Sequence, residues 1–403
     1  MTAFVPTNAK EALGAVAWAV AEEEPLEILG HGTKRGIGAP VQAAHTLDLS
    51  RLSGVTLYEA EELVLSSKAG TPLAEIEALL GSRGQELAFE PIDYGPLLGG
   101  QPGRGTIGGA LAANLSGPRR IKSGAARDHI LGVHAVSGRG EVFKSGGRVV
   151  KNVTGYDLSK VMAGSWGTLA VVTDLTFKVL PAAETETTFV LRQLEDEQAA
   201  AAMALAMGSS AEVSGSAHLP EGVADSIAGG GLGSDAATLL RVEGFGPSVA
   251  ARIAMLKALF AGAPHVEEME RERSRAIWRD VRDCMPFADG TDKPVWRISV
   301  APSEGWKLAL GIRRETPAMA FYDWQGGLLW LRMEGGEAEA QVVRRLVRQA
   351  GGHATLVRAP AAVRASHLVF EPQPPALAAL SKRLKEQFDP KGILNPGRMV
   401  SSS

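Results

Sequence analysis

The chain is poor in cysteine, and this scarcity excludes several kinds of redox centre. Its 403 residues include a single cysteine, Cys284. One thiol cannot form an internal disulfide, and one thiolate cannot hold an iron–sulfur cluster or a cysteine-type zinc site. Any electron carrier of that kind must therefore belong to another chain.

Long apolar runs and a strong net charge are also missing. The longest apolar runs, 12–21 and 199–207, are far shorter than a membrane-spanning helix. The first residues lack the basic segment and apolar core of a secretory signal. The net charge of −3 gives no reason to expect nucleic-acid binding. We therefore expect a cytoplasmic protein with no membrane span and no nucleic-acid partner.

The common nucleotide-binding fingerprints are absent as well. A glycine loop, GHGTKRGIG at 30–38, follows the strand-like run 25–29. Gly30 and Gly32 match the first two positions of the Rossmann pattern G-x-G-x-x-G, but Arg35 occupies the third. The P-loop pattern does not occur either. What remains is a loop of backbone donors beside Lys34 and Arg35, which suits the pyrophosphate of a dinucleotide.

Glycine itself is abundant, and it is concentrated in one stretch. Residues 99–124 read GGQPGRGTIGGALAANLSGPRRIKSG and contain eight glycines. The TIGGA sequence at 106–110 precedes a short apolar run, as a loop entering a helix would. Backbone N–H groups at such a junction suit a bound anion, typically a phosphate. A surface loop without a ligand is the alternative, but the stretch is long for a loop and a second glycine loop lies upstream.

The first 181 residues alternate loops with short elements. Asn8 followed by Glu11 predicts the start of a helix that ends near residue 20. Pro72 suits the first turn of a second helix that ends near residue 81. Further patterns predict strands at 62–67 and 169–179 and a hairpin formed by 130–136 and 141–144.

From residue 187 onward, strands and helices alternate in two β-α-β-β-α-β runs. This order predicts an antiparallel sheet with helices on one face, of ferredoxin-like character. A charged helix over 267–283 is expected as an insertion between the runs. It could be a docking face for a partner, or a solvated helix with one packed stripe. The last residues predict a helix at 376–388 and then a loop.

The order of these motifs resembles the vanillyl-alcohol-oxidase family of FAD-dependent enzymes, which have the PCMH-type FAD-binding fold. The resemblance rests on the loop at 30–38, TIGG at 106–109, Asn114, Arg127-Asp128, TGYDL at 154–158, GSWGTL at 164–169 and DPKGILNPGR at 389–398. Within the family, the chain is similar to 2-hydroxy-acid oxidases and D-lactate dehydrogenases. In that branch, KNVTGYDL at 151–158 and Trp166 are similar to the FAD-binding subunits of bacterial glycolate oxidases.

The resemblance implies an α+β protein with non-covalently bound FAD. It implies a PCMH-type FAD-binding domain of two α+β subdomains at 1–181, an inserted cap domain with an antiparallel sheet at 182–358, and a C-terminal segment at 359–403 that returns to the first domain. Relatives that tether the flavin covalently carry a histidine at the position of Thr33. A tether is therefore not expected here.

The same resemblance implies the residues that hold the cofactor. The first glycine loop would wrap the pyrophosphate, the second would bind it from the other side, and 114–117 would lie near the isoalloxazine. The expected cofactor-binding residues are Gly30, His31, Gly32, Thr33, Lys34, Thr106, Gly108, Gly109, Asn114, Ser116, Gly117, Val171 and Val172.

The catalytic residues cannot be assigned from the sequence. Catalytic relatives carry a metal-binding His-x-Gly-Asp-Gly-Asn-x-His string, which is absent here, so no metal site is expected. Only His129 and His134 are close in sequence, and on one strand they would face opposite sides. Three arginines expected on or beside cap strands could meet a substrate carboxylate or form ion pairs: Arg297, Arg332 and Arg358.

Three functions stay open on this reasoning. The first is the FAD-binding subunit of a multi-subunit glycolate oxidase, whose partners would be a catalytic D-type flavin subunit and an iron–sulfur subunit that passes electrons onward. Its complex would then attach it peripherally to the inner membrane. The second is a self-sufficient dehydrogenase for a small 2-hydroxy acid. The third is a flavin-free scaffold, which the costly glycine loops argue against.

Overall fold

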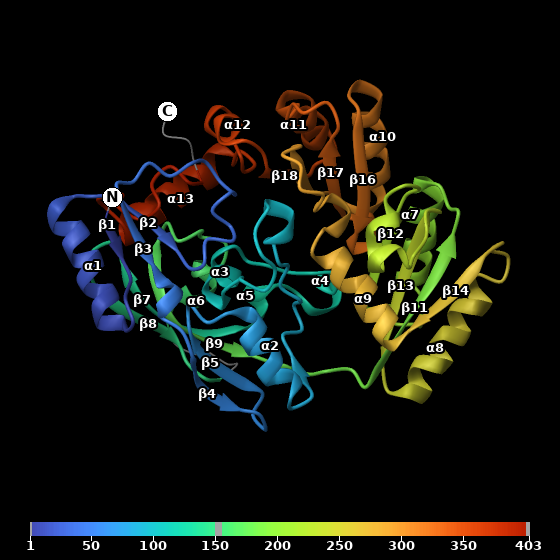
Figure 1. The fold of residues 1–403 in the computed structure, drawn as a ribbon, viewed down its shortest axis with the longest axis horizontal. Helices are drawn as coiled ribbons and strands as arrows, with labels where there is room; N and C mark the ends of the chain where they lie inside the picture. Colours follow the sequence, from blue (N-terminus) through green and yellow to red (C-terminus); the bar gives the residue numbers. More distant parts are fainter. Residues whose placement is uncertain (1, 150–154, 400–403) are drawn as a thin grey trace.

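The first lobe begins with a small parallel sheet covered by a helix. The computed structural model describes residues 2–149 and 155–399. The sheet has the order β1 (Thr2–Phe4), β3 (His45–Asp48), β2 (Leu26–Leu29), and α1 (Ala9–Glu22) packs on it through apolar side chains (Figure 1). The side chain of Asn8 accepts the N–H of Glu11 at 3.0 Å, as the capping pattern predicts.

A five-stranded antiparallel sheet forms the second half of this lobe. Its order is β4 (Val55–Glu59), β5 (Val64–Lys68), β9 (Ala170–Lys178), β7 (Ile130–Ser137), β8 (Val142–Gly146), so the predicted hairpin is confirmed. Short helices surround it: α2 (Leu73–Gly81), α3 (Ile107–Ala112), α4 (Arg120–Ser123), α5 (Ala126–His129) and α6 (Leu158–Met162). A two-stranded pair, β6 (Gln85–Glu86) with β10 (Leu180–Pro181), lies where the chain leaves for the second lobe.

The C-terminal segment returns to the first lobe. It contains α12 (Ala361–Ser366) and α13 (Pro375–Phe388), which lie beside the first lobe in Figure 1. Leu394 then pairs in parallel with Leu26 of β2. The side chain of Asn395 accepts the N–H of Ile28 at 2.8 Å and donates to the carbonyl of Trp166 at 2.8 Å. One asparagine therefore ties together both halves of the lobe and the end of the chain.

The second lobe is built on one eight-stranded antiparallel sheet. Its first half is β11 (Thr185–Arg192), α7 (Asp196–Met207), β12 (Gly215–Leu219), β13 (Ala237–Gly244), α8 (Gly246–Leu259) and β14 (Val266–Glu270). Its second half is β15 (Val295–Ser299), α10 (Gly305–Glu315), β16 (Ala318–Asp323), β17 (Leu328–Met333), α11 (Ala340–Gln349) and β18 (His353–Arg358). The sheet order is β14-β11-β13-β12-β16-β17-β15-β18. Each half has the ferredoxin-like order, as predicted.

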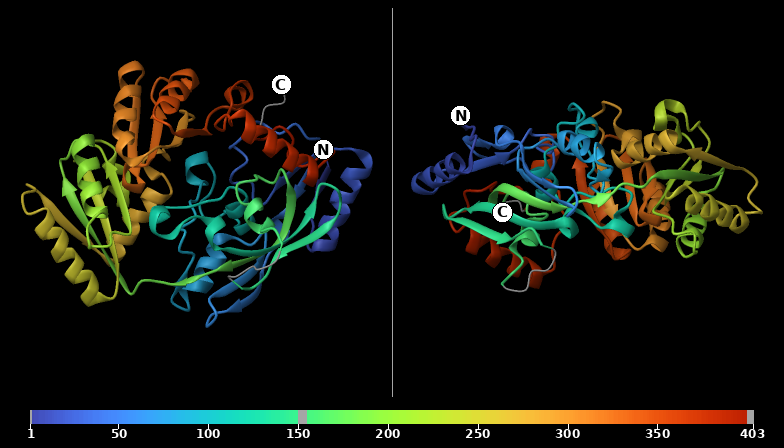
Figure 2. Two further views of the ribbon diagram at one scale, coloured as in Figure 1. Left: turned by 180° about the vertical axis from the view of Figure 1, so that it is seen from behind. Right: turned by 90° about the horizontal axis from the view of Figure 1, so that it is seen from below.

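The two faces of this sheet have different partners. The helices α7, α8, α10 and α11 pack against one face. The other face packs against α9 (Arg271–Arg282) and the first lobe, with which it shares one apolar core. The two lobes lie side by side along the longest axis of the molecule (Figure 2). The α+β, PCMH-type class is therefore confirmed, whereas the domain limits at 181 and 358 stay a prediction.

Two local predictions were wrong. The charged segment 267–283 is not one helix, because its first residues form the edge strand β14 before α9 begins. An edge strand exposed to solvent needs few apolar residues and tolerates many charges, so its sequence resembles a solvated helix. In α9, Ile277 and Trp278 are buried in the shared core. The packed-stripe alternative therefore describes α9 better than a docking face.

The second error concerns the histidine pair. His129 is the last residue of α5, is buried, and does not lie on the strand, whereas His134 is exposed on β7. The side chain of Asp128 accepts the N–H of Ala125 at 2.8 Å and stabilises this short helical turn. The two histidines thus belong to different elements.

Candidate cofactor site

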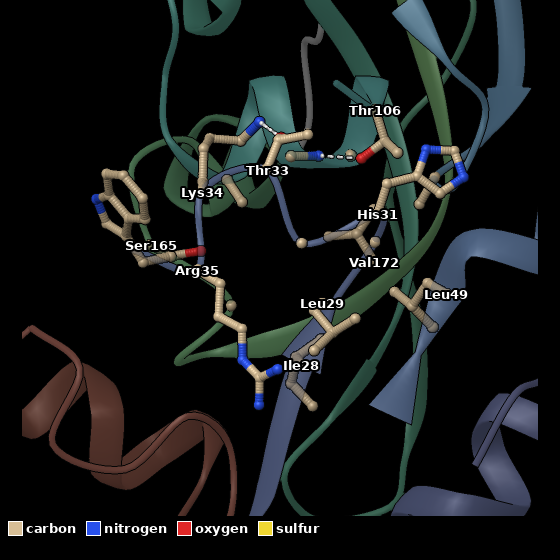
Figure 3. A pocket seen from close by; sticks show the side chains of 18 of the residues that line it. Ile28, Leu29, His31, Thr33, Lys34, Arg35, Leu49, Thr106, Ser165 and Val172 are labelled. Carbon is tan, nitrogen blue, oxygen red and sulfur yellow. Dashed lines mark hydrogen bonds between the residues drawn. The ribbon is translucent and has the colours of Figure 1, made fainter. Parts of the chain in front are cut away.

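A deep pocket opens between the two halves of the first lobe. It is an open pocket whose lining comes from both halves of the lobe and from the C-terminal segment. The first glycine loop forms one wall, and α3 with the segment from α6 to β9 forms the other (Figure 3). The pocket is lined by Ile28, Leu29, Gly30, His31, Gly32, Thr33, Lys34, Arg35, Leu49, Ala69, Thr106, Gly108, Gly109, Ala112, Met162, Ser165, Trp166, Gly167, Ala170, Val172 and Arg398.

Most of the residues predicted to bind the cofactor meet in this pocket. The structure brings together Gly30, His31, Gly32, Thr33, Lys34, Thr106, Gly108, Gly109 and Val172. Val171 precedes Val172 on β9, but its side chain is fully buried in the core beneath the small parallel sheet. Neighbouring residues on a strand point to opposite faces, so Val171 can reach a ligand only through its backbone.

Glycine is required where the two loops approach each other. A Cβ on Gly30 would lie 2.8 Å from the hydroxyl oxygen of Thr106. A Cβ on Gly109 would lie 3.0 Å from Cε of Lys34. Because both positions have no side chain, the walls come close enough to enclose a flat, narrow ligand.

The backbone donors of α3 are less available than the sequence suggests. The N–H of Gly108 donates to the carbonyl of Ala69 at 2.9 Å. The N–H of Gly109 donates to the hydroxyl of Thr106 at 3.2 Å, and Thr106 caps the helix. These N–H groups already have partners, so side-chain cations supply the clearest attraction for an anion here.

Lys34 is the first of these cations. Its ammonium group donates to the hydroxyl of Thr33 at 3.2 Å (Figure 3) and forms no ion pair with any described residue. Burial lowers the pKa of Lys34 to about 8. Arg35 points away from it and pairs with Glu27, and Asp93 attracts the ammonium group of Lys34 without forming an ion pair with it.

Arg398 is the second cation, and sequence reasoning did not include it among the site residues. It donates to the carbonyl of Lys34 at 2.7 Å and lies over the ring of Trp166, 5.5 Å from the ring centre. Its buried Nε has no hydrogen-bond partner in the described parts of the chain. Burial lowers the pKa of Arg398 to about 10. The sequence feature that could have identified Arg398 is its position as the last residue of the 389–398 motif.

The pocket chemistry fits FAD. The half-buried Lys34 and the buried Arg398 form no ion pair within the described residues, so an anion would stabilise them, and a dinucleotide pyrophosphate supplies two negative charges. The small residues and closely spaced walls suit a flat ring system. His31 also lines the pocket, where its Nδ1 lies 3.0 Å from the carbonyl of Arg104.

The remaining predicted residues leave the pocket and lead toward the cap. The side chain of Asn114 accepts the N–H of Arg127 at 3.0 Å, and Ser116 is buried. The carbonyl of Gly117 accepts the indole N–H of Trp324, which belongs to the cap, at 3.0 Å. Residues 114–117 therefore connect the cofactor pocket to the cap sheet. In the KNVTGYDL motif, residues 151–154 lie outside the described residues.

The three cap arginines differ in their surroundings. Arg332 pairs with Asp289 and Glu334, both at 2.6 Å. Arg358 donates to the carbonyls of Phe287 at 2.6 Å and Lys293 at 2.8 Å. Among these three, only the side chain of Arg297 donates no hydrogen bond and forms no ion pair within residues 2–149 and 155–399.

Metal-ligating clusters and membrane-spanning helices are both absent from the described residues. Among the described residues, no three histidine, cysteine or acidic side chains are grouped so as to hold a metal ion. Within the same residues, no helix combines the length and the apolar character needed to cross a membrane.

Comparisons with known proteins agree with this pocket. A family model described as an FAD binding domain matches residues 2–146, and one described as the C-terminal domain of FAD linked oxidases matches 364–399. Glycolate oxidase subunit GlcE of Escherichia coli (strain K12) is 35% identical over 386 residues, which are 95% of each chain. Glycolate oxidase subunit GlcD of Bacillus subtilis (strain 168) is 24% identical, over 94% of this chain and 84% of the relative.

A solved structure supports the fold. The crystal structure of p-cresol methylhydroxylase with substrate bound superposes with a TM-score of 0.73 at 14% identity, and the match covers 99% of this chain and 88% of the other. At that identity the likeness concerns the fold alone.

Proposed function

Because this chain belongs to the GlcE family of FAD-linked oxidases, we propose that it is the FAD-binding subunit of a multi-subunit glycolate oxidase. The chain is an FAD-dependent oxidoreductase by its relatives and its FAD-binding domain. The single observation that supports the assignment most is a pair of cations, Lys34 and Arg398, that line a glycine-walled pocket and form no ion pair within the described residues.

We assign the roles in the pocket as follows. Lys34 and the loop 30–34 hold the pyrophosphate, and Arg398 closes the pocket from the C-terminal segment. Residues 114–117 and the backbone of Val171 and Val172 border the ring. No residue forms a covalent tether. When bound, FAD would supply this subunit with a carrier for two electrons.

The proposed partners follow from what the chain lacks. Its single cysteine cannot hold an iron–sulfur cluster, so onward electron transfer needs an iron–sulfur subunit. It carries no metal-binding histidine string, so a catalytic D-type flavin subunit would oxidise glycolate to glyoxylate. The likeness to both a GlcE and a GlcD subunit supports an assembly of two related flavoproteins.

A visible absorption spectrum of the purified chain, before and after anaerobic glycolate or D-lactate, tests the proposal. We expect bound flavin that stays oxidised with the chain alone and is reduced when the D-type subunit is present. Bound flavin that bleaches in the isolated chain would instead establish a self-sufficient 2-hydroxy-acid dehydrogenase. A colourless chain that stays colourless in the complex would establish a scaffold.

One observation favours the self-sufficient dehydrogenase as the second candidate. Arg297 lies on the cap face that turns toward the FAD-binding lobe and has no partner among the described residues.

A further inference from the structure

A second open cleft lies at one end of the cap, between α7 and α10, which contact each other (Figure 1). Its lining comes from the start of α7, the segment between β12 and β13, α10 and the start of β16. Both ferredoxin-like halves of the cap therefore contribute to it. All of its lining residues belong to the cap, and none of them lines the cofactor pocket. The cleft is thus separate from the flavin site.

The cleft is strongly acidic. Five of its lining side chains are carboxylates, and Arg313 is its one permanent cation. Arg313 is already used, because it donates to the carboxylate of Asp196 at 2.6 Å. The other four carboxylates are exposed and form no ion pair within the described parts of the chain: Glu195, Glu197, Glu221 and Asp235.

The fold accounts for only some of this charge. Glu195 and Glu197 lie at the start of α7, where the positive end of the helix favours acids. Glu221 and Asp235 come from the segment between β12 and β13, so they have no such helix end. Asp235 accepts a hydrogen bond from the side chain of Gln193 at 3.2 Å, which leaves its charge uncompensated. This part of the cleft lacks a cation that the described residues do not supply.

The same cleft exposes apolar surface. Leu310 of α10 is 39% exposed, and Trp306, one turn earlier, is half-buried. Residues four apart lie on one face of a helix, and both of these line the cleft. Lysine and arginine side chains combine an apolar stem with a charged head. They therefore match both the acids and the apolar surface.

His218 brings an unused hydrogen-bonding atom to the cleft. On β12, Ala217 and Leu219 pack into the core shared with the first lobe. Because side chains alternate along a strand, His218 points to the opposite face, where it stacks on Tyr322 with ring centres 5.8 Å apart. It is 1% exposed and lines the cleft.

The two ring nitrogens of His218 differ in their surroundings. Nδ1 lies 3.0 Å from the hydroxyl oxygen of Thr238. Nε2 is buried and has no hydrogen-bond partner among the described residues, although Oδ1 of Asp196 lies 3.4 Å away. With Nδ1 donating to Thr238, Nε2 is an acceptor that lacks a donor. A cationic head beside Asp196 would supply that donor.

We propose that this cleft docks a basic segment of a partner chain. One lysine or arginine head contacts Asp196 and Nε2 of His218, further cations face Glu221 and Asp235, and apolar neighbours cover Leu310. Because the unpaired acids come from two separate segments of the cap, a peptide with several cations fits better than a single small cation. The inference goes beyond the proposed function, since the cleft lies outside the flavin site.

The test measures the binding of a defined probe to the purified chain. The probe is a short fluorescein-labelled peptide of alternating lysine and leucine, and fluorescence anisotropy records its binding at physiological ionic strength. We expect saturable binding, and none of the matched peptide with glutamate in place of lysine. Glu221→Lys with Asp235→Lys should weaken binding by about 10-fold, because two attractive charges become repulsive. Leu310→Ser should weaken it by about 3-fold without changing the charge.

A matched double reversal separates the cleft from the general charge of the protein. Glu59→Lys with Glu61→Lys reverses two exposed acids of the first lobe and should leave binding unaltered. Circular dichroism and thermal unfolding confirm that each variant folds. No saturable binding, equal binding of the two peptides, or equal losses in the two double reversals would overturn the inference.

Sedimentation of the chain without peptide tests a different occupant. We expect no self-association that depends on the cleft. A dimer that Glu221→Lys with Asp235→Lys dissociates would assign the cleft to a second copy of this chain and overturn the inference. Flavin content, read separately by absorbance, decides the proposed function.

Discussion

Arg119 of the FAD-binding lobe donates from Nε to both carboxylate oxygens of Glu243 on the cap strand β13, at 3.1 and 3.0 Å. A second pair crosses it, because Arg241 of the cap donates to Glu90 of the first lobe at 2.8 and 3.0 Å. Each lobe thus contributes one arginine and one glutamate. Arg119 follows Gly117 by two residues, so these crossed pairs also fix the segment between the pocket and the cap.

Removing Glu243 should destabilise the protein strongly. In Glu243→Gln, Arg119 and Arg241 lose one charged partner but keep Glu86 and Glu90, each at 2.8 Å, and the free energy of unfolding should fall by about 1.5–3 kcal/mol. Urea unfolding at pH 7 measures this loss. Arg192→Met is the matched control, because Arg192 pairs at 3.0 Å with the half-exposed Glu267 within the cap, and it should cost less. Equal losses in the two variants would show that the crossed pairs between the lobes contribute no more to stability than the half-exposed pair within the cap.

Glu243 should also make the free energy of unfolding depend on pH in the acid range. Its two arginine partners lower the pKa of Glu243 to about 2, below its ordinary value of 4.5, despite burial. A carboxylate with a lowered pKa stabilises the fold above its unfolded pKa, and this contribution is lost as the pH falls through about 2. The slope of unfolding free energy between pH 4.5 and 2 should therefore be shallower in Glu243→Gln, and an unchanged slope would contradict the assignment.

Asp323 should act with the opposite sign. Burial raises its pKa to about 7 from an ordinary 3.8, so the native state retains a proton that the unfolded chain releases. Stability from this group is present below pH 3.8 and is lost as the pH rises through about 7. Asp323→Asn should be more stable than the unmodified chain at pH 8, by up to about 4 kcal/mol. It should lose this advantage near pH 4.

Asp292→Asn provides the control for that experiment, since Asp292 is an exposed acid. Its unfolding free energy should follow the unmodified chain at both pH values. A parallel pH dependence in Asp323→Asn and the unmodified chain would show that Asp323 titrates normally in the folded state.

Lys34→Met should weaken FAD binding by about 10- to 100-fold, because it removes a buried charge from the pocket. The pKa of about 8 adds a pH dependence, since Lys34 loses its proton above that value when the pocket holds no anion. FAD affinity of the unmodified chain should therefore decrease between pH 7 and 9, and that of Lys34→Met should change less. Equilibrium dialysis with absorbance at each pH measures this. Lys382→Met, an exposed change on α13, should leave FAD affinity unaltered.

Gly109→Asp should abolish flavin binding for a reason that the structure supplies. The new carboxylate would project from a Cβ 3.0 Å from Cε of Lys34 and pair with its ammonium, which removes the charge meant for the pyrophosphate. Gly109→Ala is the matched control, because its methyl group meets the flexible end of Lys34 and the Thr106 hydroxyl at 3.0–3.1 Å without adding a charge, and flavin should remain. Flavin occupancy is measured as the ratio of the flavin absorbance at roughly 450 nm to the protein absorbance at roughly 280 nm. Full occupancy in Gly109→Asp would contradict the assignment of Gly109 to the flavin-binding site.

The sequence indicated the fold well where local pattern and tertiary structure agree. Alternating strands and helices after residue 187 predicted both ferredoxin-like halves, because short β-rich runs there alternate with longer helical ones. The pattern failed for β14, an edge strand whose outer side needs no apolar residues. It also failed for His129, where the backbone N–H of Ala125 donates to the Asp128 carboxylate and stabilises a helical turn just before a strand.

The sequence by itself determined the class of cofactor and the loops that surround it. Glycines at 30, 108 and 109 leave no side chain between the loops, and Lys34 adds a positive charge. These local properties suit a narrow, anion-binding wall and can be read from the sequence. The tertiary structure alone decided which cations stay unpaired. Arg35, Arg332 and Arg358 find acids or carbonyls, whereas Lys34, Arg398 and Arg297 find no acidic partner among the described residues. Pairing depends on distances between residues far apart in the chain, and burial makes an unpaired charge costly, so only the tertiary structure identifies the cations that lack an acidic partner.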